Sequence, residues 1–403
     1  MFVGYNKPHE TDINGNTVDK FVDDDRLKIL VHPANTGGCA YYRCWLPFKK
    51  LEEAVPGKVQ IIFDLNPLRK NPKTGEDGDP TENFNTCDIF FSHNICNFGG
   101  VYNLKALHYA RSKDTILHYD TDDLLTDLYD GHRLQNLYKE KRLDDITKEC
   151  YQIAHLVSVT QSKFAERVVP FVKGALVIMK NKVDFTLPCW NQPKVKTKFV
   201  KIGWAGGIHH EEDVKEFERV ALRVNAKVGA ENVHWGFYGR PPLTKPEDKW
   251  QQEVWDNYVK SLAQGIRNFK VYPSLSTWDY GKMYSNMDIA IAPLQMNDFN
   301  DSKSQIKVVE AGLYKVPLIA SNVGCYDQHI KNGYNGYLIE PGKGSAGFTN
   351  KIIKLCKDKK LRNQMGENLY TTIKDEFNIH NSPADRLTLY QDLIETVKNY
   401  KNG

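Results

Sequence analysis

The sequence predicts an α/β fold made of two similar halves, each built around a parallel sheet. Short apolar runs of strand length alternate with amphipathic stretches of helical period along most of the chain, a pattern typical of βαβ units. These runs are continuously apolar, as expected for parallel strands that helices cover on both faces. A strand, a glycine loop and a helix follow one another after residue 26 and again after residue 199.

In the first half, a strand in RLKILVH is followed by the loop Thr36-Gly37-Gly38-Cys39 and by a helix expected to begin near Ala40. Further strands are expected in VQIIFDL (59–65), CDIFFSH (87–93), DTILHYD (114–120) and HLVSVT (155–160), with a helix around 101–112. In the second half, strands are expected in VKIGWA, VHWGFYG (233–239), FKVYPSL (269–275), DIAIAPL (288–294), VPLIAS (316–321) and GYLIE (336–340).

The segment FTLPCWNQPKVKTK carries two prolines and no usable period, which indicates a connection between domains. We therefore expect an N-terminal domain over 1–184, a linker over 185–198 and a second domain over 199–382. A C-terminal helix over 383–403 follows, for which packing against the first domain is one option.

Composition narrows the class of protein. The 403 residues hold 54 Lys+Arg against 50 Asp+Glu, a net charge of +4, which allows a polyanionic partner without demanding one. No apolar run approaches the ~18 residues of a membrane span, and the polar start does not resemble a secretory signal. The eight cysteines include no C-x-x-C pair. We expect reduced thiols and a cytoplasmic location, in the host if the gene belongs to a phage.

Two glycine loops, at Gly37–Gly38 and at Gly206–Gly207, each follow the first strand of a half. Open parallel sheets bind ligands beyond the carboxyl ends of their strands, and helix N-termini favour phosphate. Neither loop is a G-x-G-x-x-G or Walker A motif, so dinucleotide binding and ATP hydrolysis lose support. A plain tight turn is the alternative for each loop.

The most informative segment is 301–321. Lys303, Lys307 and Glu310 are spaced by four and three, so on a helix starting near Ser302 they would share one face. Such a turn suits a diphosphate, and a carboxylate one turn later can accept both hydroxyls of a ribose. The alternative is an amphipathic helix with a surface Lys–Glu pair.

The segment SKSQIKVVEAGLYKVPLIAS, followed by GYNGYLIEP, resembles the donor-binding region of retaining glycosyltransferases of the GT-B fold. NTGGCAYYR, HYDTDD, KNKVDF and GWAGG extend the resemblance, which is strongest to a bacterial and phage-encoded subgroup. It implies two Rossmann-like domains facing each other across a cleft. It also implies a nucleoside diphosphate sugar as donor, first a UDP-sugar, with Glu310 on the ribose and Lys303, Ser304 and Lys307 at the diphosphate.

One position departs from the larger family, which often carries a second glutamate eight residues earlier. Here that position is Ser302, and Asp298 and Asp301 are the nearby acidic residues. The residue that meets the sugar is therefore left open.

Asp120-Thr121-Asp122 reads as a D-x-D, the motif that holds a divalent metal ion in the GT-A fold. In a GT-B context we favour an acceptor-contacting or sugar-contacting role, with Asp123 beside it, and no required cofactor. Metal binding and local capping remain alternatives. His93 and His118 lie at strand ends where a ligand could reach them, although a structural role is the commoner one for a lone histidine.

Tyr42 and Arg43 open the helix behind the first glycine loop, on the expected acceptor side. Arg43 could bind a phosphate in bidentate fashion, whereas the tyrosines could stack or pack. In the second half, Tyr272 and Pro273 follow a strand where the family reads the nucleotide base. An ordinary strand end is the alternative there.

The resulting hypothesis is a retaining glycosyltransferase that acts on a hydroxyl. Double-stranded DNA with hydroxymethylated bases is one acceptor, since Lys194, Lys196, Lys198 and Lys201 would suit a phosphate backbone and a flipped base would reach a cleft. Cell-envelope glycan, lipid-linked sugar and protein are other acceptors. A nucleotide-sugar epimerase and a non-catalytic nucleotide-sugar or DNA-binding protein are the alternative functions. The sequence does not indicate the oligomeric state.

Overall fold

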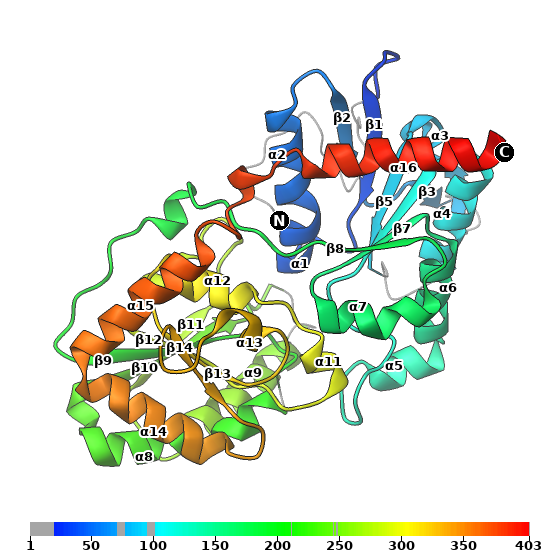
Figure 1. The fold of residues 1–403 in the computed structure, drawn as a ribbon. Helices are drawn as coiled ribbons and strands as arrows, with labels where there is room; N and C mark the ends of the chain where they lie inside the picture. Colours follow the sequence, from blue (N-terminus) through cyan, green and yellow to red (C-terminus); the bar gives the residue numbers. More distant parts are fainter. Residues whose placement is uncertain are drawn as a thin grey trace. The chain divides into compact units, whose positions relative to one another are not determined.

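The computed structural model describes residues 20–70, 77–94, 101–210, 212–244, 246 and 249–402. Residues 1–19, at the polar start of the sequence, and Cys96 lie outside these residues. The chain forms two compact units, one comprising Met1–Val183 with Ile379–Gly403 and the other Asp184–Asn378 (Figure 1). In the described part of the chain, no helix combines the length and apolar character needed to span a membrane.

The first unit contains a six-stranded sheet in the order β2-β1-β5-β6-β7-β8, with every neighbouring pair parallel. Every residue of β2, β5, β6 and β7 is buried. The continuous apolar runs therefore do correspond to strands covered on both faces. The strands are β1 Leu27–His32, β2 Val59–Phe63, β5 Ile89–His93, β6 Ile116–Asp120, β7 Leu156–Val159 and β8 Ala175–Ile178.

Three strands of the first unit were not expected from the sequence. β8 lies at the edge of the sheet, where its four residues are exposed or half-buried, so it lacks the sustained apolar run of its neighbours. β3 Leu68–Lys70 and β4 Asp77–Pro80 form a separate antiparallel pair.

The helix after the first glycine loop begins at Gly38, two residues before the expected start. It runs through α1 Gly38–Ala40, the π-helical turn η1 Tyr41–Trp45 and α2 Leu46–Ala54. The other helices of the unit are α3 Glu82–Thr86, α4 Val101–Ser112, α5 Gln135–Glu140, α6 Leu143–Ile153, α7 Ser162–Val168, η2 Val169–Phe171, η7 Ile379–Asn381 and α16 Asp385–Asn402.

The C-terminal helix α16 belongs to the first unit, where Figure 1 shows it in red beside the blue and cyan elements. Tyr390 is fully buried and lies 2.8 Å from a ring nitrogen of His118 on β6. The guanidinium of Arg386 lies 4.4 Å from the ring centroid of Phe48 and 5.3 Å from that of Phe91. Both residues therefore anchor α16 to the core of this unit.

The second unit contains a parallel sheet in the order β11-β10-β9-β12-β13-β14. This is the 3-2-1-4-5-6 order of the Rossmann fold, in which ligands bind where the strand order reverses, here beyond β9 and β12. Its strands are β9 Val200–Ala205, β10 Val233–Arg240, β11 Phe269–Pro273, β12 Ile289–Ala292, β13 Leu318–Ser321 and β14 Gly336–Ile339. The predicted pair of Rossmann-like parallel sheets is confirmed.

A large apolar core lies within the second unit. Trp204 on β9, Trp235 on β10 and Trp255 on α9 are almost fully buried within it. The helices of the unit are η3 Pro188–Trp190, η4 Asp213–Phe217, α8 Val220–Val228, η5 Ala230–Asn232, α9 Lys249–Leu262, α10 Lys282–Ser285, α11 Asp298–Asp301, α12 Ile306–Leu313, α13 Tyr326–His329, α14 Gly344–Lys357 and α15 Lys359–Ile373.

Candidate functional site

The second glycine loop follows the carboxyl end of β9. Gly206 is buried, donates its N–H to the carbonyl of Tyr238 (3.0 Å) and accepts from the indole N–H of Trp255 (3.2 Å). A Cβ at Gly206 would overlap the ring of Trp204, whereas a Cβ at Gly207 would meet nothing within 4 Å. The loop is therefore fixed at its first glycine and exposed at its second, which leaves the backbone open to a ligand.

Lys307 connects this loop with the 301–321 segment. The residue lies on α12, and its Nζ donates a hydrogen bond of 2.5 Å to the carbonyl of Ala205. Burial lowers the pKa of Lys307, Glu310 opposes this shift, and the charge of Lys303 adds to it. The second glycine loop and the 301–321 segment, about a hundred residues apart in the sequence, thus form one electropositive site at the end of β9.

The expected helix start near Ser302 is wrong. The short helix α11, capped by the side chain of Asn297, ends at Asp301 with Ser302 as its C-cap, and α12 begins only at Ile306. Ser302 is fully buried and its hydroxyl donates to the carbonyl of Asp298 (2.8 Å). Lys303 and Ser304 therefore lie in the connection between the two helices. The Nζ of Lys303 is 4.5 Å from the ring centroid of Phe299.

Glu310 is 2% exposed on α12. Its Oε2 accepts a hydrogen bond of 2.8 Å from the hydroxyl of Tyr284 on α10. Burial and the charge of Glu310 raise the pKa of Tyr280 well above its usual value. Tyr284 was not expected from the sequence, because nothing in the pattern of α10 relates it to α12.

His210 and Asp213 are also new to the site. The Nδ1 of His210 lies 2.7 Å from Oδ2 of Asp213, whose side chain is 1% exposed. The other oxygen, Oδ1, accepts from the backbone N–H of Gln295 (2.9 Å) and from Nδ2 of Asn300 (2.7 Å). Asp213 thus joins the loop after β9 to the segment that leads into α11. The sequence offered one signal for this pair, namely a histidine three residues before an aspartate.

Tyr272 and Pro273 lie at the carboxyl end of β11. The Tyr272 ring stacks on Tyr238 with centroids 4.4 Å apart and an angle of 5° between the rings. Pro273 is exposed and lines a cavity of about 380 Å³ together with Arg240 and Gln252. Arg240 is held there by Asp256, at 2.8 and 3.0 Å. The role of Tyr272 and Pro273 in binding the nucleotide base stays a prediction.

In the first unit, Arg43 forms an ion pair inside the fold. Its side chain is 2% exposed and contacts both oxygens of Asp120, at 2.9 and 2.5 Å. The remaining nitrogen, Nη1, donates to Oδ1 of Asn181 (3.0 Å) and to the carbonyl of Met179. Burial would raise the pKa of Asp120, but Arg43 outweighs it and holds that pKa below its ordinary value. This geometry favours a positioning role over capture of an acceptor phosphate.

His93 and Asp122 also come together at the carboxyl ends of β5 and β6. His93 Nε2 lies 3.4 Å from Oδ1 of Asp122, which also accepts from Nδ2 of Asn94 at 2.7 Å. Burial alone would lower the pKa of His93, but the neighbouring Cys44 and the hydrogen bond with Asp122 together raise it well above its usual value. The pair can hold a proton, as a general acid or base must.

The first glycine loop borders the same residues. Gly37 and Gly38 are exposed, and a Cβ at Gly38 would meet nothing within 4 Å. Tyr42 is half-buried, with its ring edge-on to Tyr41 at 5.2 Å. Ligand atoms of Cys39, Asp122 and Asp123 lie within 4.8 Å of one another, a spacing that could hold a metal ion. Asp120, the first carboxylate of the D-x-D, is committed to Arg43 instead.

His118 lies deeper in the first unit. It is fully buried, with one ring nitrogen 2.8 Å from the hydroxyl of Tyr390 and the other 2.7 Å from that of Ser158. Burial lowers its pKa well below the usual value, and the charge of Arg386 adds to this shift. These contacts hold His118 within the fold, so its role in binding an acceptor stays a prediction.

The lysines after the linker differ in their surroundings. Lys201 is 7% exposed and donates to the carbonyl of Val195, and Lys194 donates to the carbonyl of Lys315 at 3.3 Å. Lys196 and Lys198 are exposed. Two of the four side chains are therefore engaged by the fold of the second unit.

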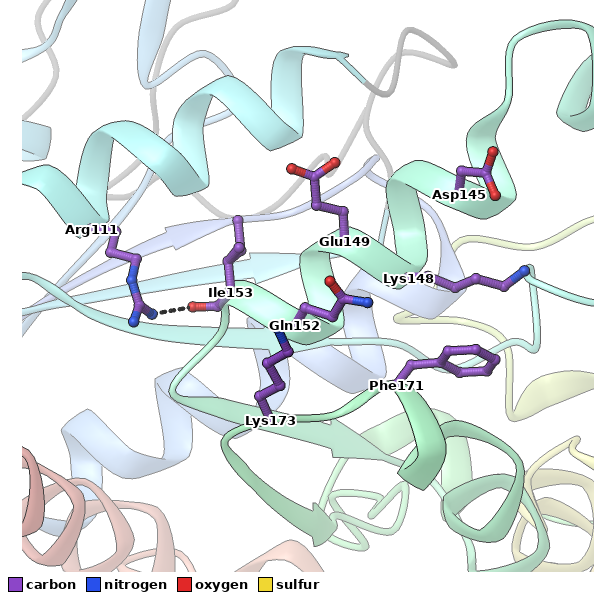
Figure 2. A pocket seen from close by; sticks show the side chains of 8 residues that line it. All are labelled: Arg111, Asp145, Lys148, Glu149, Gln152, Ile153, Phe171 and Lys173. Carbon is purple, nitrogen blue, oxygen red and sulfur yellow. Dashed lines mark hydrogen bonds between the residues drawn. The ribbon is translucent and has the colours of Figure 1, made fainter.

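A larger cavity of about 610 Å³ lies elsewhere in the first unit (Figure 2). Lys148, Glu149 and Gln152 reach it from α6, and Arg111 donates to the carbonyl of Ile153 at 2.6 Å. Its walls contain none of the predicted site residues.

Solved structures share this architecture. Sucrose-phosphate synthase from Thermosynechococcus elongatus superposes with a TM-score of 0.67 at 13% identity, covering 92% of this chain and 100% of that one. Anabaena HepE, solved with UDP and glucose, has a TM-score of 0.61 at 13% identity, covering 91% and 100%. The fold is therefore that of the GT-B glycosyltransferases.

Part of the second unit also matches a known family in sequence. Residues 251–372, which include Glu310, Lys303 and Lys307, match the family described as "Glycosyl transferases group 1". N-acetyl-alpha-D-glucosaminyl L-malate synthase of Bacillus anthracis is 32% identical over 94 residues, 23% of this chain and 24% of that protein. The match thus spans about a quarter of this curated relative. Residues 251–372 therefore resemble the glycosyl transferases group 1, and the predicted resemblance is confirmed for this part of the chain.

Proposed function

We propose that the protein transfers a sugar from a nucleoside diphosphate sugar to a hydroxyl group, with retention of the anomeric configuration. The donor binds the second unit at the end of β9. Gly206 and Gly207 let the diphosphate approach the backbone, Lys303 and Lys307 neutralise it with Ser304 beside them, and Glu310 accepts hydrogen bonds from the ribose. Tyr272 and Pro273 border the nucleotide base.

The contact between Lys307 and the carbonyl of Ala205 carries this proposal. It brings the ammonium of one motif to the glycine loop of another, at the strand-order reversal where Rossmann-like sheets bind ligands. Glu310 lies one turn further along the same helix. A UDP-sugar is the first donor to test, since the similar HepE structure contains UDP and glucose.

In the proposed reaction, the bond between the anomeric carbon and the diphosphate oxygen breaks, and a bond to the acceptor oxygen forms on the same face of the sugar. The acceptor proton passes to the leaving diphosphate. Positive charge near that diphosphate stabilises the transition state more than the ground state, because negative charge grows on the diphosphate as the bond breaks. No cofactor is required by this scheme.

On the first unit, we propose His93 and Asp122 as the groups that contact the sugar or the acceptor, with Tyr42, His118 and Asp123 at the acceptor side. Arg43 and Asp120 act by holding the ends of η1 and β6 in place. Hydroxymethylated bases in double-stranded DNA are the first acceptor to test, with the exposed Lys196 and Lys198 as contacts for its backbone. Cell-envelope glycans follow in the same panel.

The experiment measures nucleoside diphosphate release from UDP-, GDP- and ADP-sugars, with and without each acceptor. Wild type is compared with Glu310→Gln and with the matched control Glu218→Gln, an exposed glutamate of the same unit. We expect acceptor-stimulated release that Glu310→Gln lowers by at least about a hundredfold, ~2.7 kcal/mol, and that the control leaves unchanged. The anomeric configuration of the product, read by NMR, tests retention.

Absence of binding to every sugar nucleotide in the panel would contradict the proposal. Donor binding without release under any acceptor would favour a non-catalytic binding protein instead. Release that requires hydroxymethylated DNA would identify the acceptor, whereas release with glycans alone would exclude DNA from that role.

A further inference from the structure

We propose that His210, held through Nδ1 by Asp213, takes up a proton at Nε2 when a diphosphate binds beside Lys303 and Lys307, so that a third positive charge arises only in the loaded site. This inference rests on the proposed function and adds to it a group that the family assignment does not supply. It concerns how the site adjusts its charge to the ligand.

The first step is the orientation of the imidazole. The side chain of His210 is 13% exposed, and its ring packs edge-on to Trp204 with centroids 5.9 Å apart. Its Nδ1 lies 2.7 Å from Oδ2 of Asp213. Asp213 is an acceptor here, so Nδ1 carries the hydrogen and the neutral tautomer leaves Nε2 unprotonated.

The second step is the rigidity of Asp213. Its carboxylate is 1% exposed and accepts from Gln295 N–H and Asn300 Nδ2 as well as from His210. Burial would raise the pKa of Asp213, but the bond and charge of His210, Lys303 and the Gln295 bond hold it below its ordinary value. A carboxylate held in this way stays ionised and fixes the direction of the imidazole, as in other carboxylate–histidine pairs.

The third step is the charge around the ring. Among the described residues, the charged groups that face His210 are Asp213 from η4, Lys303 ahead of α12 and Lys307 on α12. Burial lowers the pKa of His210, Asp213 opposes that shift, and the two lysines add to it. In the empty site the imidazole is therefore neutral near pH 7.

A bound diphosphate reverses this balance. It places negative charge next to both lysines, which removes their repulsion of an imidazolium and adds an attraction of its own. Within the described residues, Nδ1 is the His210 nitrogen for which the structure shows a hydrogen bond, so Nε2 remains to take a proton from solvent and donate it to a phosphate oxygen. The loaded site then holds three cations, and the empty site avoids their mutual repulsion.

The test is isothermal titration calorimetry with UDP-glucose, followed by GDP-glucose and ADP-glucose if needed, in buffers of different ionisation enthalpy. Sugar nucleotides are used because their phosphates carry constant charge between pH 6 and 8. If binding raises the pKa of His210 by about one unit, wild type should take up about half a proton at the pH midway between the free and bound values. Its affinity should then rise several-fold from pH 8 to pH 6, towards the tenfold limit that a shift of one unit sets.

His210→Gln should bind with no proton uptake and with less than about a twofold change in affinity over the same range. The matched control is His209→Gln, which replaces the exposed neighbouring histidine and should behave as wild type. The wild-type proton count does not depend on any variant, so absence of proton uptake would contradict the proposal even if the His210→Gln protein folded poorly.

The outcomes separate the two proposals. If wild type binds none of the sugar nucleotides, the donor site itself is contradicted and this inference with it. If wild type binds one of them without proton uptake, or if His210→Gln takes up the same number of protons, the donor site stands. His210 and Asp213 then serve only to tie the loop to α11.

Discussion

The hydroxyl of Tyr284 donates a 2.8 Å hydrogen bond to Oε2 of Glu310, joining α10 to α12 in the second unit. One carboxylate oxygen is thereby occupied within the protein, and the direction of the other is fixed. Such support favours binding of a ribose by the carboxylate, because the side chain is already oriented and loses little conformational entropy when the ligand binds.

Replacing Tyr284 with Phe removes this donor and leaves a buried carboxylate with one bond fewer. We expect the free energy of unfolding to fall by about 1.5–3 kcal/mol, the range for hydrogen bonds to charged groups. Sugar-nucleotide affinity should fall as well. Urea denaturation and calorimetry measure the two effects. Tyr334→Phe, at a tyrosine that is 54% exposed, is the matched control, and an unchanged urea midpoint in Tyr284→Phe would contradict the assignment.

The buried pair of Arg43 and Asp120 predicts a large cost when one partner is removed. Asp120→Asn should lower the free energy of unfolding by about 3–5 kcal/mol, because the guanidinium then stays buried without its counter-charge. The control is Asp145→Asn at the exposed Arg142–Asp145 pair, where we expect a change within about 0.5 kcal/mol. Equal effects of the two substitutions in urea denaturation would refute this account of Arg43.

The same pair predicts how stability depends on acid. The pKa of Asp120 is lower in the folded protein than in the unfolded chain, so its contribution is present above the unfolded pKa and disappears as pH falls through the folded value. Asp120→Asn should therefore flatten the loss of stability below about pH 4. The measurement is the free energy of unfolding at a series of pH values. The same loss of stability at low pH in wild type and Asp120→Asn would contradict this prediction.

His118 predicts a pH dependence in a different window. Burial lowers its pKa, so the unfolded state gains a proton first and stability decreases as pH falls below about 6.5. His118→Gln should make this slope shallower by up to about 1.4 kcal/mol per pH unit. His108→Gln, at a side chain that is 53% exposed, serves as the control. Parallel slopes for wild type and His118→Gln would contradict the assignment.

The two glycines after β9 predict opposite outcomes for the same substitution. Gly206→Ala places a Cβ against the ring of Trp204 and should destabilise the protein by about 1–3 kcal/mol. Gly207→Ala meets no atom within 4 Å, so stability should change by less than about 0.5 kcal/mol. If a diphosphate occupies that space, Gly207→Ala should weaken binding at least tenfold, ~1.4 kcal/mol. Unimpaired binding would move the ligand away from this loop.

The sequence allowed most of the sheets to be predicted, because parallel strands that are buried on both faces must be apolar throughout. β8 was not predicted, because an edge strand with no fully buried residue has no such requirement. The start of α12 was misplaced for another reason. The spacing of Lys303, Lys307 and Glu310 fits a continuous helix, but α11 already ends at Asp301, and the Oδ1 of Asp301 accepts from the distant Gly324 N–H at 3.0 Å.

The sequence indicated several residues of the candidate site. It did not indicate which side chains or backbone groups those residues contact. Lys307 and the glycine loop after β9 could be singled out separately, yet the contact of Lys307 with Ala205 depends on β9 and β12 lying side by side in the sheet. Arg43 was expected to face an acceptor, but its partner Asp120 is 77 positions away. His210 was overlooked because its significance comes from Asp213, and the significance of Asp213 comes from bonds to Gln295 and Asn300.

The assignment of residues 379–403 to the first unit has a consequence for synthesis on the ribosome. Tyr390 and Arg386, which pack on His118, Phe48 and Phe91, are translated only after the whole of the second unit. At 5–20 residues per second, the 184–378 stretch takes roughly 10–40 s to make. During that time the earlier unit lacks part of its core. The unit that begins translation first is thus the last to finish folding, and its unfinished surface is where a chaperone would be expected to bind.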